Sequence, residues 1–165
     1  MAGKNVGLME AIQIAMDAEA KANKFYADSA KKVASEQGKN LLKQLADFEQ
    51  NHYNKLNELK TSLEKEGKFI KYEGTEFKPF TIEIAPEGSR KLEPNKDDVM
   101  DILGMAIEAE TKAHQHYKRM ANETKDKDGK EMFQKLAEEE TMHRRILSDE
   151  FYQIANSSGM WVWGE

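Results

Sequence analysis

Four glutamates and two histidines carry the chemistry that this sequence can support. The six residues are Glu19, Glu49, His52, Glu110, Glu140 and His143. Each histidine follows a glutamate by three residues, and positions i and i+3 share one face of a helix. Carboxylate oxygens and imidazole nitrogens suit iron and tolerate manganese. Four carboxylates balance the charge of two divalent ions, so the set predicts a dinuclear metal site, with two iron ions expected and manganese as the alternative.

The elements that must position these residues repeat along the chain. Residues 9–56 align with residues 100–147 at an offset of 91 without a gap, and 15 of the 48 positions are identical. Shared helical composition would give scattered matches rather than one register of this length, so the chain is interpreted as two copies of one unit. The offset superimposes the first three candidate ligands on the last three.

Each unit has the pattern of a helical hairpin. Apolar residues recur every three or four positions, which draws one stripe along a helix, and the candidate ligands lie on these stripes. Buried glutamate is rare unless it is paired or binds a metal. The two glutamates of each hairpin are equally far from its turn, so folding brings them level. Glutamates and histidines could fall on one stripe by chance, but a match at equal depth in four helices favours the metal site.

The sequence predicts an all-α protein of one domain, a four-helix bundle with one long crossover between its second and third helices. The crossover would let these two helices run parallel, and segments 69–72 and 80–84 resemble short strands within it. Asp128 is expected to cap the fourth helix. Trp161 and Trp163 are expected to dock on the bundle or on a second subunit. The expected bounds are 5–66 for hairpin 1, 67–95 for the crossover, 96–156 for hairpin 2 and 157–165 for the tail, within a domain of residues 1–165.

Composition excludes several other classes of function. The chain has 165 residues, a net charge of −5 and no cysteine. The absence of cysteine removes disulfides, cysteine nucleophiles and thiolate-bound metals. Without a basic face nucleic acid is not expected as a partner, and without a long apolar run neither is a membrane. The first residues lack the apolar stretch of a secretion signal, so we expect a soluble, cytoplasmic protein.

The arrangement resembles the di-iron domain of rubrerythrins, within the ferritin-like superfamily. The resemblance covers the four helices and rests on Glu19 with Phe25-Tyr26, Glu49-x-x-His52, Glu110 with Tyr117, and Glu140-x-x-His143. It implies that Glu49 and Glu140 bridge two metals, and that Glu19 and Glu110 each bind one, beside the two histidines.

Two departures from the resemblance concern the reaction. Typical rubrerythrins add a cysteine-bound iron domain, which is absent here, so electrons would come from a separate, rubredoxin-like donor. They also carry a further glutamate where this chain has Ala113, which leaves a more symmetric site.

Two roles are possible for the tyrosines near the candidate ligands, and two for the remaining histidines. Tyr26 and Tyr117 lie two turns after Glu19 and Glu110 on the same face, so they either pack in the core or donate a hydrogen bond to a ligand carboxylate. His114 and His116 are expected to be exposed or to support the site rather than to bind metal.

Three functions remain open from the sequence. Rubrerythrin-like proteins reduce hydrogen peroxide to water, and the resemblance favours this reaction. The same site could oxidise ferrous iron with dioxygen or peroxide, for storage or detoxification. A non-enzymatic metal-binding scaffold is the third reading, and a manganese site would favour catalase-like chemistry. A homodimer is the expected assembly.

Overall fold

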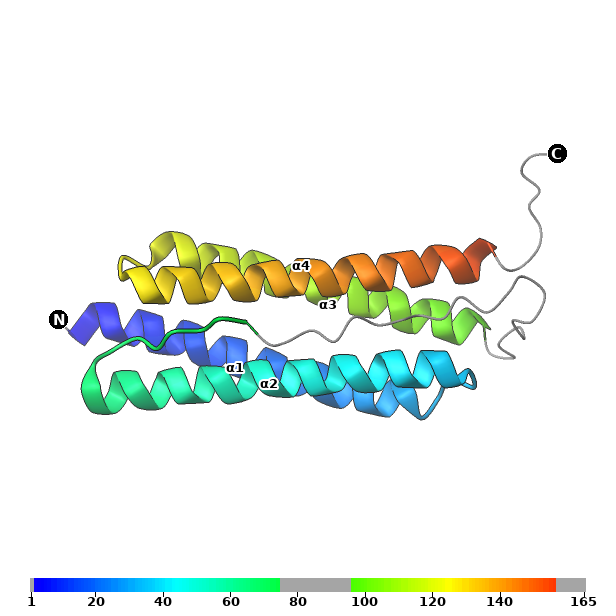
Figure 1. The fold of residues 1–165 in the computed structure, drawn as a ribbon, viewed down its shortest axis with the longest axis horizontal. Helices are drawn as coiled ribbons and strands as arrows, with labels where there is room; N and C mark the ends of the chain where they lie inside the picture. The colour runs from blue at the N-terminus through cyan, green and yellow to red at the C-terminus, as the bar shows by residue number, and fades with distance from the viewer. Residues whose placement is uncertain (1, 75–95, 157–165) are drawn as a thin grey trace.

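The computed structural model describes residues 2–74 and 96–156, which contain four long helices. They are α1 (Ala2–Ala30), α2 (Glu36–Glu66), α3 (Lys96–Glu123) and α4 (Lys127–Asn156). Helices α1 and α2 form one antiparallel hairpin, and α3 and α4 form the other; α2 and α3 run in the same direction (Figure 1). The expected all-α four-helix bundle is confirmed.

Local signals fix the ends of the helices. Ser35 caps α2, since its side chain accepts a hydrogen bond from the Gly38 backbone N–H at 3.1 Å. The helix ends at Gly67, whose φ of 66° is favourable for glycine. The expectation that Asp128 caps α4 is wrong. Asp126 Oδ1 accepts the hydrogen bond from the Gly129 N–H at 2.9 Å, because the helix starts one residue before Asp128.

The core consists of two apolar clusters with a polar layer between them. One cluster contains Ile12, Leu56 and Phe133. The other, at the opposite end of the bundle, contains Leu45 and Leu103. On α1 the first cluster ends at Met16 and the second begins at Tyr26, so the helix passes through the polar layer near Glu19. Burial of both clusters holds this layer in place.

The described part of the crossover packs on the bundle as an extended segment. Residues 67–74 turn back along the helices from the end of α2 (Figure 1). The expected strand at 69–72 is wrong: no strand lies within residues 2–74 and 96–156 to pair with it. Instead, the Phe69 ring lies edge-on to Phe133, against Gly129, where an added Cβ would meet the ring at 2.5 Å. The second expected strand, the tail and its tryptophans lie outside the described residues.

Candidate metal centre

The six candidate ligands meet in the polar layer at mid-bundle. Each helix contributes at least one of them, and each is at most 2 % exposed. They are Glu19 from α1, Glu49 and His52 from α2, Glu110 from α3, and Glu140 and His143 from α4. The structure thus brings all six together, and their role as metal ligands remains a prediction.

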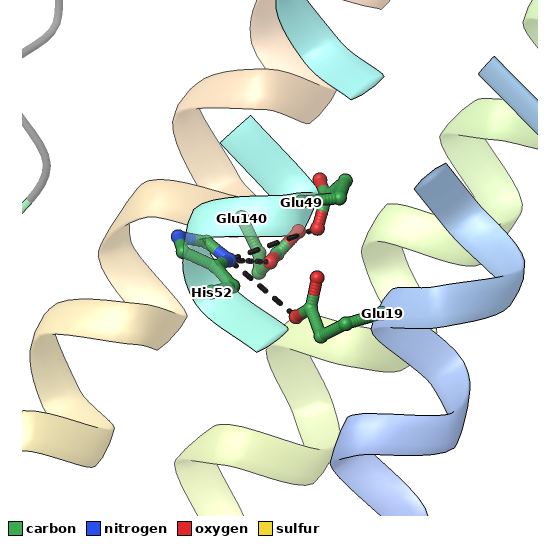
Figure 2. Close-up of side chains that lie close together, drawn as sticks. All are labelled: Glu19, Glu49, His52 and Glu140. Carbon is green, nitrogen blue, oxygen red and sulfur yellow. Dashed lines mark hydrogen bonds and ion pairs between the residues drawn. The ribbon is translucent and has the colours of Figure 1, made fainter. Parts of the chain in front are cut away.

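The six side chains divide into two overlapping groups. In each group the four potential ligand atoms lie within 4.8 Å of one another. The first group contains Glu19 and His52, the second contains Glu110 and His143, and both contain Glu49 and Glu140. Figure 2 shows the first group converging from three helices. Two metal positions that shared these two carboxylates would form one dinuclear site rather than two separate mononuclear ones.

Each histidine directs Nδ1 at the carboxylates. His52 Nδ1 lies 2.8 Å from Glu140 Oε1 and 3.4 Å from Glu19 Oε1. His143 Nδ1 lies 3.1 Å from Glu49 Oε1. Each imidazole therefore contacts the shared glutamate of the other hairpin most closely, so the site ties the two hairpins together.

Burial and mutual repulsion perturb the carboxyl groups. Burial, helped by the negative charge of Glu49, raises the pKa of Glu19 from 4.5 to about 8. Burial raises the pKa of Glu140 well above its usual value, and Glu110 and Glu19 add to the effect. For Glu110 burial would also raise the pKa, but hydrogen bonds with Glu140 and His143 outweigh it and lower the pKa to about 2.

The pKa values of the two histidines are raised, whereas burial alone would lower them. Burial would lower the pKa of His52, but the negative charge of Glu19 and hydrogen bonds to neighbouring carboxylates raise it well above 6.5. The pKa of His143 is raised in the same way, mainly by hydrogen bonds to Glu110 and Glu140. Protons thus neutralise this cluster of negative charge. A divalent ion that binds neutral imidazole and carboxylate would take over that role and release the protons.

The donor set fits two divalent ions of the iron or manganese kind. Glu19 Oε2 and Glu110 Oε2 are buried and lack a hydrogen-bond partner among the described residues. Buried polar atoms without a partner are rare and call for an explanation. Helical bundles typically bind such ions in oxygen-rich sites with one imidazole per ion. The residues present therefore fit two iron or manganese ions.

Two buried tyrosines support the unshared glutamates across the hairpins. Tyr26 donates to Glu110 Oε1, and Tyr117 donates to Glu19 Oε1, each at 2.5 Å. Burial, together with the charge of the partner carboxylate, raises the pKa of both phenols, so they stay neutral donors. The expected hydrogen bond to a ligand carboxylate is present, and each tyrosine also packs in the core at 1 % exposure.

The other two histidines lie outside the ligand groups. His114 Nδ1 contacts Thr141 Oγ1 at 2.8 Å, and His116 Nε2 contacts the Ala11 carbonyl at 3.0 Å. Both are half-buried and join neighbouring helices. The sequence reasoning missed Glu139, a buried carboxylate that accepts a hydrogen bond from the Tyr72 hydroxyl. The signal that could have found it is the unlike residue at the same place in the first repeat, Phe48.

A cavity of about 440 Å³ reaches the site between α1 and α3. Apolar side chains such as Ala22, Phe25 and Ala113 form most of its wall, and all four candidate glutamates also line it. Ala113 lines the cavity, and its small side chain leaves space there. Small molecules can approach the carboxylates by this route.

Fold and site together define a four-helix bundle with a buried cluster of four carboxylates and two histidines that could hold two metal ions. A family model described as Rubrerythrin matches residues 2–60 and 101–159, one match in each repeat. The chain therefore belongs to the rubrerythrin family. A hypothetical protein from Pyrococcus furiosus has a similar solved structure, with a TM-score of 0.72, 26% identity and 93% of each chain covered. No curated protein sequence matches the chain significantly.

Among the helices of the described residues, none combines the length and the apolar character that a membrane span requires.

Proposed function

We propose that this protein is a di-iron oxidoreductase that reduces hydrogen peroxide to water with electrons from a separate donor protein. The observation that carries the proposal is the pair of ligand groups that share Glu49 and Glu140. Two ferrous ions in such a site supply the two electrons that reductive cleavage of an O–O bond requires. Membership of the rubrerythrin family supports this reaction class.

The residues of the chain have separate tasks in this reaction. The four carboxylates and the two Nδ1 atoms would bind the ions and hold them side by side. Tyr26 and Tyr117 fix the orientation of Glu110 and Glu19 through their hydroxyl groups. The apolar wall of the cavity restricts access to small molecules and limits the water around the carboxylates. The 165 residues contain no cysteine to bind a further iron centre, so we propose a rubredoxin-like protein as the electron donor.

The first test is the metal content of protein purified without added metal or chelator. Two iron ions per chain are expected, and the double variant Glu49→Ala, Glu140→Ala should bind neither. An exposed pair, Glu58→Ala with Glu131→Ala, is the matched control for the loss of two charges, because these exposed side chains lie on the same two helices, α2 and α4. Equal iron content in all three proteins would refute the dinuclear site.

The second test separates peroxide reduction from iron handling. Protein loaded anaerobically with two ferrous ions is mixed with one equivalent of peroxide or of dioxygen, and iron oxidation and peroxide loss are followed. Faster reaction with peroxide, with iron retained at two per chain after re-reduction, supports the proposal. Preferential oxidation by dioxygen with iron accumulating beyond two per chain would establish iron handling instead.

A further inference from the structure

The two repeats differ at the residue that precedes each shared glutamate. The first repeat has Phe48 and the second has Glu139, at the same offset of 91. Both lie against the histidine of the other hairpin. The Phe48 ring meets the His143 ring edge-on, with centroids 4.5 Å apart, whereas Glu139 Oε1 lies 3.4 Å from His52 Nε2. The two histidines therefore bind equivalent sites from unlike surroundings.

The crossover completes this asymmetry. The Tyr72 hydroxyl donates a hydrogen bond to the same oxygen, Glu139 Oε1. Tyr72 is 9 % exposed and Glu139 is 5 % exposed, so the contact is shielded from water. Neither His52 Nε2 nor His143 Nε2 completes a hydrogen bond among the described residues, but of the two only His52 Nε2 faces a carboxylate oxygen, Glu139 Oε1 at 3.4 Å. A hydrogen-bonded Tyr72–Glu139 pair thus lies behind His52, and within residues 2–74 and 96–156 no such pair lies behind His143.

We propose that Glu139 and Tyr72 are positioning residues for His52, and that they make the metal position beside Glu19 and His52 the tighter of the two. This inference rests on the proposed dinuclear centre. A carboxylate opposite the imidazole Nε2–H fixes the tautomer that leaves the Nδ1 lone pair free for a metal, and it raises the basicity of that nitrogen. His143 gains neither effect from the Phe48 ring. The position beside His52 fills first, and the docked crossover takes part in holding its metal.

The test is an anaerobic titration of metal-free protein with Co²⁺, followed by visible absorption in competition with a chelator of known affinity. Loss of a supporting carboxylate typically lowers metal affinity ~10–100-fold. The unaltered protein should therefore bind Co²⁺ in two steps separated at least ~10-fold. Glu139→Gln should weaken the first step by about that factor and leave the second nearly unchanged, so that the two steps merge.

Two further variants make the result specific. Tyr72→Phe keeps the aromatic packing and removes only the hydroxyl group. It should also reduce the difference in Co²⁺ affinity between the two steps, by a smaller factor than Glu139→Gln does. Phe48→Leu changes the matching position of the other repeat and should leave the difference in Co²⁺ affinity between the two steps unchanged. The cobalt absorption bands of the first step should also shift in Glu139→Gln, which a merely structural role would not produce.

The outcomes separate this inference from the proposed function. Equal Co²⁺ affinities of the two positions in the unaltered protein would overturn the inference. So would a difference in affinity that stays unchanged in Glu139→Gln and Tyr72→Phe. If Glu139→Gln loses its helical circular dichroism, Tyr72→Phe alone decides. A protein that binds no Co²⁺ refutes the metal centre and this inference with it. Two unequal steps in a protein without peroxide turnover support the inference and refute the proposed reaction.

Discussion

The metal-free protein should lose stability as the pH rises from 5 to 8. Burial raises the pKa of Glu19 from 4.5 to about 8. In the unfolded chain this carboxyl group loses its proton near pH 4.5, but in the folded chain it keeps the proton until about pH 8. The folded state binds more protons across this window, so stability falls as pH rises. His52 and His143 act in the same direction above pH 6.5, because their folded pKa values are also raised.

The magnitude is large relative to the stability of a domain. At ~1.36 kcal/mol for each pKa unit, a rise from 4.5 to about 8 corresponds to roughly 5 kcal/mol for Glu19. About 3.5 kcal/mol of this loss falls between pH 5 and 8, because the unfolded carboxyl group is already partly ionised at pH 5 and the folded one is half ionised at pH 8. Domains of this size lose about 2–4 °C in Tm per kcal/mol, so the expected fall is about 7–14 °C. Glu110 does not offset it, because its pKa is lowered to about 2 and its contribution is lost only as the pH falls below about 4.5.

The assay is thermal unfolding by circular dichroism in the presence of chelator at pH 5, 6, 7 and 8. Glu19→Gln removes the titrating group and keeps an acceptor for Tyr117, so it should flatten the dependence. Glu10→Gln, an exposed position on the same helix, should leave it unchanged. A divalent ion at 100 times its Kd adds about 2.7 kcal/mol per site, and more of this should appear at pH 8 than at pH 5, since the ligands must lose protons. A Tm that stays constant or rises with pH in chelator would refute the reasoning.

Three further predictions address the ligands, the tyrosines and the crossover. Glu140→Ala should lose both metal ions because both groups share this carboxylate, whereas Glu110→Ala should lose one, and metal analysis distinguishes the two. Tyr26→Phe should lower the free energy of unfolding by about 1–3 kcal/mol in urea titrations, since it leaves a buried carboxylate without its donor. Gly129→Ala should destabilise the protein by about 1–3 kcal/mol through overpacking against the crossover. Its counterpart Gly38→Ala, whose added Cβ meets nothing closer than 3.5 Å, should be neutral or stabilising.

The convergence of the six candidate ligands could be predicted because two independent periodicities constrain their positions. The helical period places each charged residue on an apolar stripe, and the offset of 91 fixes its depth relative to the other repeat. The cap of α4 was less well determined, because Asp126 and Asp128 both suit the role and only the start of the helix decides between them. The segment at 69–72 has strand-like residues, but β structure depends on a partner strand that local sequence cannot supply.

Local sequence patterns could not predict the contacts between the two hairpins. Spacing puts Tyr26 and Tyr117 on the faces of Glu19 and Glu110, but it does not show that each hydroxyl reaches the glutamate of the other hairpin. That crossing depends on how the hairpins pack. The contact of Tyr72 with Glu139 was less accessible still, because it joins the crossover to α4 and has no counterpart in the repeat.

The difference between the repeats therefore matters as much as their identity. Six candidate ligands and two tyrosines obey the offset, so the two ligand groups are equivalent in composition. At the position before the shared glutamates the repeats diverge, and Phe48 and Glu139 give the two histidines an aromatic and an anionic neighbour. A buried carboxylate is retained at a cost unless it is well partnered. Here the partners are a histidine that faces the site and a tyrosine on the crossover, which has no copy in the repeat. Symmetry in the candidate ligands suits them to two metal ions, and asymmetry behind the two histidines is the basis of the proposed difference in affinity between those ions.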